Sequence, residues 1–184
     1  VPRERAAKLM RVLVFGKTGQ VAHELQSFGG IIALGRADAD LNDPAVCAEI
    51  IATTDADVVI NAAAYTAVDA AETDTDKAFM VNSDAPTAMA EAAAKRALPF
   101  LHISTDYVFD GTGMTPWTED DPTAPLGIYG SSKLAGEHGV RAAGGPLAIL
   151  RTSWVVSAHG TNFVRTMLRL GTERDALNIV ADQI

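Results

Sequence analysis

The chain has 184 residues, and its 15 lysines and arginines against 23 aspartates and glutamates give a formal charge of −8. A hydrophobic share of 48% and a charged share of 21% are typical of a globular domain with a buried core and exclude a disordered chain. The acidic balance disfavours binding to nucleic-acid phosphates, the single Cys47 excludes an internal disulfide, and no apolar run reaches the roughly 20 residues that span a bilayer.

Residues 1–10 are interpreted as an N-terminal extension. They carry no apolar period, and the first strand pattern begins only at Arg11. They also lack the apolar core of a signal peptide, so we expect a cytoplasmic protein. The remaining residues, 11–184, are long enough for one domain of generous size.

Short β-branched apolar runs alternate with helical patterns along the rest of the chain. Helices are predicted at 19–28, from Pro44 onwards, and at 75–97, 131–142 and 162–170, between strands at 11–15, 31–34, 57–61, 100–104, 147–151 and 177–180. Strands separated by helices predict a parallel sheet that is covered on both faces. The fold class is therefore α/β, and the doubly wound Rossmann fold is the best match.

The polar stretch 105–127 is the exception to this compact pattern. It contains three prolines, several glycines and the acidic run Glu119-Asp120-Asp121. Unstructured connections of this length in a compact domain are usually functional, and this one leaves the carboxyl end of a strand, where open α/β sheets bind ligands.

A glycine turn, Gly16-Lys-Thr-Gly19-Gln-Val-Ala22, joins the first strand to the first helix. Such a turn lets the backbone approach a pyrophosphate, which then rests on the helix N-terminus. The turn has Gly-Lys-Thr at its start and not as the ending that a Walker loop requires, and glycines here can also be merely structural. Its place after the first strand favours dinucleotide binding.

The residue after the second strand bears on the choice of dinucleotide. NAD enzymes usually carry an acid there for the ribose 2′-hydroxyl, whereas this chain has Gly35-Arg36. An arginine can meet the extra phosphate of NADP, so NADPH is favoured and NADH remains an alternative. A solvent-exposed arginine is the competing interpretation, and Asp38 and Asp40 lie close by in the sequence.

Tyr129 and Lys133 open a predicted helix, and Thr105 lies just past the fourth strand. The spacing of four places tyrosine and lysine on one helix face, where an ammonium would lower a tyrosine pKa that normally lies near 10. Thr105 could orient a carbonyl while Tyr129 exchanges its proton. Alone, such a pair is more typical of a surface helix. Combined with the glycine turn, in this order, it indicates a catalytic set.

Other candidates are weaker. The four histidines have no ligand spacing, so we expect no metal site, and Cys47 is interpreted as an inert small hydrophobe. The acids between 69 and 76 fit a solvated loop and helix start. Trp154, just past a strand's carboxyl end, is assigned a stacking role in preference to a core position.

These motifs resemble the extended short-chain dehydrogenase/reductase family and, within it, the dTDP-4-dehydrorhamnose reductases. The resemblance is carried by the segments 12–21, 61–69, 104–109, 125–137, 151–154, 162–163 and 182–183. It implies NADPH- or NADH-dependent reduction of the 4-keto group of dTDP-4-dehydro-L-rhamnose to dTDP-L-rhamnose, a step in nucleotide-sugar and cell-surface polysaccharide biosynthesis. The implied partner is the dTDP-sugar substrate, with no nucleic acid or membrane partner, and a homodimer is left open.

The resemblance also implies site residues. The catalytic residues are Thr105, Tyr129 and Lys133, and the substrate-binding residues are Thr105, Asp106, Tyr107 and Trp154. The cofactor-binding residues that the resemblance implies are Gly16, Thr18, Gly19, Gln20, Val21, Asp40, Leu41, Ala62, Ala63, Ala64 and Tyr65. Arg36, argued above from its place after the second strand, and Tyr129 and Lys133 complete the predicted cofactor-binding set. The chain departs from the family in having Ala22 for a common glycine, Tyr65 for a frequent histidine, and no acid directly after the second strand.

The family continues past Asp182-Gln183 into a substrate-binding lobe. We therefore expect 11–184 to be an NAD(P)-binding Rossmann domain from which that C-terminal lobe is missing.

Two alternatives remain. The first is another nucleotide-sugar epimerase or reductase of the same family, and the residues do not exclude a 4-epimerase. A 4,6-dehydratase is disfavoured, because Asp106 is followed by Tyr107 and not by the glutamate of that family. The second alternative is a non-catalytic NADP-binding subunit resembling the regulatory subunit of methionine adenosyltransferase.

Overall fold

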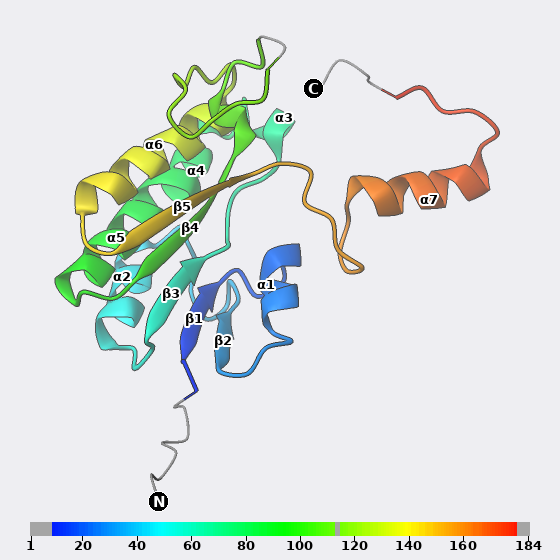
Figure 1. Ribbon diagram of the computed structural model, residues 1–184. Helices are drawn as coiled ribbons and strands as arrows, with labels where there is room; N and C mark the ends of the chain where they lie inside the picture. Colours follow the sequence, from blue (N-terminus) through cyan, green and yellow to red (C-terminus); the bar gives the residue numbers. More distant parts are fainter. Residues whose placement is uncertain (1–8, 113–114, 180–184) are drawn as a thin grey trace, which may run out of the picture.

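The computed structural model describes residues 9–112 and 115–179, and Figure 1 shows an α/β sheet whose strands all run in the same direction. Its five strands lie in the order β2-β1-β3-β4-β5. Their bounds are β1 Val12–Phe15, β2 Ile31–Leu34, β3 Val58–Asn61, β4 Phe100–Thr105 and β5 Leu147–Thr152. Each matches a predicted strand to within one residue at either end.

The strand order reverses between β1 and β3, because β1 pairs in parallel with β2 on one side and with β3 on the other. In doubly wound sheets the crevice at such a switch point, outside the carboxyl ends of the strands, is where nucleotides bind. The predicted Rossmann-type fold is confirmed, and the glycine turn after β1 lies at this switch point.

The helices fall close to their predicted positions, except the short α3, which was not predicted. Their bounds are α1 Gln20–Leu25, α2 Pro44–Thr53, α3 Val68–Ala71, α4 Thr75–Phe79, α5 Ala85–Lys95, α6 Ile128–Ala143 and α7 Phe163–Glu173, with a π-helical turn η1 at Met80–Asp84 and a 3₁₀ turn η2 at Asp106–Val108. The predicted helix 75–97 is thus α4, η1 and α5 in succession. At the start of α2 the Asp43 side chain caps the Val46 N–H, and Pro44 occupies the first turn.

The main core lies between the sheet and the layer of α2, α5 and α6, which Figure 1 shows on one side. Leu13 and Phe15 point into it from β1, Ile51 from α2 and Met89 from α5. Small buried alanines in α5 let this helix pack closely against its neighbours. Cys47 is fully buried there, and burial raises its pKa to about 11, which keeps the thiol protonated and unreactive.

Two expectations about the end of the fold are wrong. Residues 177–179 are described and form no strand, whereas Val180 lies outside the described residues. The reason is that α7 stands away from the sheet, so the chain after it does not return to the edge at β5 (Figure 1). The face opposite the core is also incompletely covered, because Ile32 and Leu150 keep 47% and 46% of their surface exposed.

Within the described part of the chain, none of the helices is long and apolar enough to cross a membrane.

Candidate active site

The glycine turn after β1 adopts a conformation that other residues disfavour. Gly16 has φ +109°, and a Cβ there would lie 2.9 Å from the backbone of Ala62. The turn and the segment after β3 are therefore in direct contact, and the Ala62 N–H also donates to the Phe15 carbonyl at 3.0 Å. Two predicted cofactor segments, 16–21 and 62–65, meet at the switch point.

This turn has the properties of a pyrophosphate cradle. Thr18 and Gly19 are exposed, α1 begins at Gln20 with its N–H groups directed at the turn, and the described first turn of α1 has no acidic residue. A helix N-terminus without a nearby carboxylate favours an anion. The residues present therefore fit a dinucleotide.

Asn82 fixes the segment after β3 and was missed by the sequence analysis. From the π-helical turn, its side chain accepts from the Tyr65 N–H at 2.8 Å and donates to the Tyr65 carbonyl at 3.0 Å and to Ser132 Oγ at 3.1 Å. It thus joins the 62–65 segment to α6. The signal available in the sequence was an asparagine inside an alanine-rich helix, where asparagine is unfavourable without a partner.

After β2, the acids and the arginine have different surroundings. Asp38 Oδ2 accepts from the Gly35 N–H at 2.9 Å, and Asp40 Oδ1 accepts from the Asn42 side chain at 2.7 Å. Both carboxylates are thus bound to their own turns, whereas Arg36 is exposed. The bond from the Asn42 N–H and the charge of Arg36 both lower the pKa of Asp40, and the contact of Arg36 with a 2′-phosphate stays a prediction.

The predicted catalytic residues come together at the carboxyl end of β4. Thr105 ends β4, with 5% of its surface exposed, and lies near Tyr129 from the first turn of α6, close enough for its hydroxyl to lower the pKa of the phenol. The helix can approach this closely because Gly130 has no side chain. A Cβ at this position would lie only 2.2 Å from the Tyr107 carbonyl oxygen. Glu72 Oε1 caps the helix by accepting from the Ile128 N–H at 2.8 Å.

The expected lowering of the Tyr129 pKa is wrong. Burial raises the pKa of Tyr129, and although the contact with Thr105 lowers it, the charge of Asp106 raises it further. Lys133, which was expected to lower it, donates from Nζ to the Ile103 carbonyl at 2.7 Å. The phenol is therefore the favoured form at neutral pH, which suits a proton donor.

Lys133 has 1% of its surface exposed and lies beside the fully buried His102 of β4, with 3.4 Å between Nζ and Nε2. Burial lowers the pKa of Lys133 to about 8, although the charge of Glu137 raises it. Burial also lowers the pKa of His102 well below its usual value, and the charge of Lys133 lowers it further. His102 is therefore neutral near pH 7, and Lys133 titrates close to the physiological range.

Glu137 is a second buried ionisable group on α6. Its carboxylate accepts from Ser104 Oγ at 2.6 Å and pairs with Arg151 at 2.8 Å and Arg141 at 3.0 Å. Burial raises its pKa, but the bonds from Arg151 and Ser104 and the two arginine charges bring it below the ordinary value. The ionised carboxylate thus ties α6 to β4 and β5.

The predicted substrate residues lie around the same strand ends. Asp106 accepts from Thr105 Oγ1 at 3.1 Å and from Ser153 Oγ at 2.5 Å, which links the ends of β4 and β5. Tyr107 is exposed and packs edge-on against Tyr129, with ring centroids 5.5 Å apart. Trp154 is 58% exposed and has φ +51°, a strained conformation for a bulky residue.

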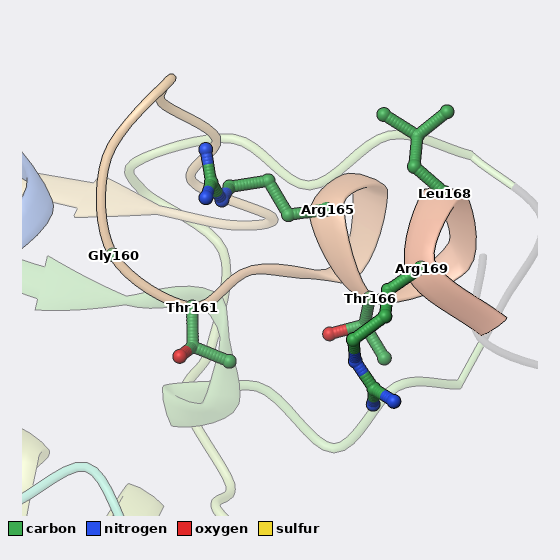
Figure 2. A pocket seen from close by; sticks show the side chains of 6 residues that line it. All are labelled: Gly160, Thr161, Arg165, Thr166, Leu168 and Arg169. Atoms are coloured by element: carbon green, nitrogen blue, oxygen red, sulfur yellow. The ribbon is translucent and has the colours of Figure 1, made fainter.

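A hollow of about 440 Å³ lies near the start of α7, lined by Gly160, Thr161, Arg165, Thr166, Leu168 and Arg169 (Figure 2). Its lining includes none of the predicted catalytic residues. Gln20 connects this segment to α1, because its Oε1 accepts from Asn162 Nδ2 at 2.8 Å. Gln20, a predicted cofactor-binding residue, therefore fixes the segment after β5 against α1.

His23 and His159, which lie far apart in the sequence, are close together beside Glu24 in the structure. The rings of His23 and His159 stack at 3.9 Å with an interplanar angle of 29°, and Glu24 accepts from Ser157 Oγ at 2.6 Å. Imidazole binds a metal along a lone pair in its ring plane at about 2.0 Å. Stacked, nearly parallel rings do not aim two such lone pairs at one point, so this cluster is explained by stacking.

The chain is similar to known proteins over nearly its whole length. The family model for the RmlD substrate binding domain matches residues 10–184. Among curated proteins, the chain is 49% identical to a dTDP-4-dehydrorhamnose reductase of Burkholderia thailandensis and 48% identical to one of Sinorhizobium fredii, in each case covering 95% of the chain. In both cases it spans only 60% of the length of the relative.

Solved structures give the same picture. A dTDP-4-dehydrorhamnose reductase of Clostridium acetobutylicum is 38% identical with a TM-score of 0.87, covering 91% of this chain and 61% of that one. One from Bacillus anthracis, in complex with NADP, is 35% identical with a TM-score of 0.85, covering 90% and 60%.

Proposed function

The chain belongs to the RmlD substrate binding domain family, and on that premise we propose that it serves NADPH-dependent reduction of the 4-keto group of dTDP-4-dehydro-L-rhamnose to dTDP-L-rhamnose. The observation that carries the proposal is that Tyr129 lies near Thr105 and on the same helix as the buried Lys133, at the carboxyl ends of the strands that also present the glycine turn. The names of the curated relatives and the NADP complex of the Bacillus anthracis reductase support it.

The proposed cofactor site is the switch point. The 16–21 turn would hold the pyrophosphate at the start of α1, Arg36 the 2′-phosphate, Asp40 and Leu41 the adenine side, and 62–65 the remaining part. NADPH, when bound, supplies the hydride. Tyr129 and Lys133 would complete the site from α6.

The proposed proton chemistry belongs to the residues at the end of β4. The Thr105 hydroxyl orients the substrate carbonyl, and Tyr129 gives its proton to the carbonyl oxygen as the C4 centre is reduced. A raised Tyr129 pKa keeps that proton in place at neutral pH until the oxygen becomes basic. Asp106, Tyr107 and Trp154 would position the sugar nucleotide.

The test is an assay of the protein with dTDP-4-dehydro-L-rhamnose and NADPH, following nucleotide oxidation and the sugar product together. We expect one NADPH consumed for each dTDP-L-rhamnose formed. An epimerase would interconvert sugars without consuming nucleotide. A regulatory subunit would bind NADPH and consume none with any nucleotide sugar. Either result, obtained with a chain that also carries the substrate-binding lobe, would refute the reductase.

A further inference from the structure

Arg151 of β5 and Ser104 of β4 share one buried partner. The two residues are paired in register on their strands, and both side chains bond to Glu137 of α6. Glu137 is fully buried, and its two carboxylate oxygens accept from Arg151 Nε at 2.9 Å and from Arg151 Nη2 at 2.8 Å. This two-pronged arrangement holds the planar guanidinium in one orientation.

The guanidinium has one face and one further N–H group to offer, and the chain after β4 uses both. The guanidinium carbon lies over the ring of Phe109, 4.9 Å from its centroid, and Nη1 donates to the Glu119 carbonyl at 3.4 Å. Phe109 is nearly buried and stacks on Trp117, with ring centroids 4.6 Å apart and an interplanar angle of 5°. We call Arg151, Phe109 and Trp117 the Arg151 stack.

The Arg151 stack lies directly behind two predicted substrate residues. Asp106 and Tyr107 occupy the 3₁₀ turn η2, and at its near end the Tyr107 N–H donates to Thr105 Oγ1 at 3.2 Å. At its far end the Phe109 N–H donates to the Asp106 carbonyl at 2.9 Å. The turn is thus held between the end of β4 and Phe109, so a displaced Phe109 also displaces Tyr107.

Charge compensation of Glu137 does not by itself account for Arg151. Arg141 also pairs with Glu137, at 3.0 Å and with 47% of its own side-chain surface exposed, so the carboxylate has a second cation. A lysine in place of Arg151 would supply the same charge without the flat face or the fixed fork of N–H groups. The contacts to Phe109 and Glu119 therefore depend on properties that are specific to arginine.

We propose that Arg151 is a positioning residue for the sugar-nucleotide substrate: held by Glu137, it fixes Phe109 and thereby the turn that presents Asp106 and Tyr107. The substrate part rests on the proposed function, in which these two residues contact the sugar nucleotide. The Arg151 stack lies beyond β4 and β5, whereas the proposed cofactor segments follow β1 and β3. Loss of the stack should therefore weaken binding of the sugar nucleotide and leave binding of NADPH unchanged.

The first measurement is ¹⁹F NMR of protein labelled with 5-fluorotryptophan, in which Trp117→Phe assigns the Trp117 signal by removing it. Arg151→Lys keeps a positive charge opposite Glu137 but removes the flat face under Phe109. The Trp117 signal should therefore narrow and move towards that of the free amino acid. Arg141→Lys, the same change at the other arginine of Glu137, is the matched control and should leave the signal unchanged.

The second measurement is steady-state kinetics with the sugar nucleotide and NADPH, in a chain that also carries the substrate-binding lobe. Arg151→Lys should raise KM for the sugar nucleotide about three- to tenfold, with kcat and the Kd for NADPH unchanged within about twofold. Phe109→Leu leaves the bond between Arg151 and Glu137 in place and should have the same effects on KM and on the Trp117 signal. This second variant decides the question if Arg151→Lys does not fold.

An unmoved Trp117 signal in Phe109→Leu or in folded Arg151→Lys, or a moved signal with an unchanged KM, would overturn the proposal. Equal effects from Arg141→Lys would also overturn it, because any weakening of the Glu137 pairs would then suffice. A wild type that binds dTDP-L-rhamnose but oxidises no NADPH would refute the reductase alone. An active wild type whose KM neither variant changes would refute the positioning role alone.

Discussion

The region formed by β4 and α6 differs from the segment after β5 in the contacts that hold it in place. Lys133, Glu137 and His102 are buried, and each has its polar atoms bonded within the sheet and α6. By contrast α7, all of whose residues are described, has no buried side chain, and Phe163 and Leu168 are 40% and 69% exposed. The proposed proton-transfer site is thus built into the core, whereas the segment carrying Trp154 is held by surface hydrogen bonds to α1.

Replacing Tyr129 tests the region formed by β4 and α6, and we expect it to have the largest effect on activity. Tyr129→Phe removes the proposed proton donor and keeps the ring that packs against Tyr107. We expect kcat to fall about 10²- to 10⁴-fold with the Kd for NADPH unchanged within about twofold. Steady-state kinetics and a nucleotide titration decide the point, and near-normal turnover would remove Tyr129 from the mechanism.

Substitutions of two glutamates, one in each region, compare how much each region contributes to the free energy of unfolding. Glu137→Ala leaves Arg151 half-buried without its partner and should cost about 3–5 kcal/mol of unfolding free energy. Glu173→Ala breaks the exposed Arg169 pair of α7 and should cost only about 0.3–0.5 kcal/mol. Urea unfolding of both variants gives the comparison, and similar losses would contradict it.

The contribution of Glu137 to stability depends on pH, and the direction follows from its lowered pKa. The folded-state pKa of Glu137 is lowered, so its contribution is complete above its unfolded pKa of about 4.3 and is lost as the pH falls through the folded value. The stability difference between wild type and Glu137→Ala should therefore shrink below about pH 4. A difference that stays constant to pH 3 would show that the carboxylate charge is not what stabilises this region.

Replacing Trp154 tests the segment after β5, which surface hydrogen bonds hold. Trp154→Ala should raise KM for the sugar nucleotide about three- to tenfold, the value of one aromatic contact, and leave the Kd for NADPH unchanged. Phe163→Leu, which changes only its edge-on partner 5.1 Å away, is the control and should have a smaller effect. An unchanged KM in Trp154→Ala would mean that this residue does not face the substrate.

The smallest effect concerns Arg36. Arg36→Ala should narrow the preference for NADPH over NADH in kcat/KM about five- to tenfold, since one exposed contact to the 2′-phosphate is lost. Lys17→Ala, in the neighbouring glycine turn, is the matched control and should weaken both nucleotides alike. An unchanged ratio in Arg36→Ala would show that the arginine faces solvent only.

The parts that the sequence predicted are local patterns. The first five strands, the Gly16 turn and the Tyr129 to Lys133 spacing each lie within a few residues, and the structure contains them as expected. Asn61 and His102, or Glu137 and Arg151, come from separate segments, and only the packed sheet makes them partners. The sign of the Tyr129 pKa was missed for the same reason, since burial and the bond from Lys133 to Ile103 depend on tertiary structure.

The strand expected at 177–180 failed for a different reason. Its apolar residues fit a strand, but a strand also needs an edge to pair with, and α7 leads the chain away from β5 (Figure 1). Local propensity does not specify that path.

Hydrogen exchange measured by mass spectrometry, with and without NADPH, tests the contrast between the two regions most directly. Without nucleotide, amides of β4 and α6 should exchange slowly and those of α7 near the rate of an unfolded peptide, because α7 buries no side chain. With NADPH, new protection should appear at 16–22 and 62–65. Protection of α7 equal to that of α6, or NADPH that protects neither turn, would contradict this account.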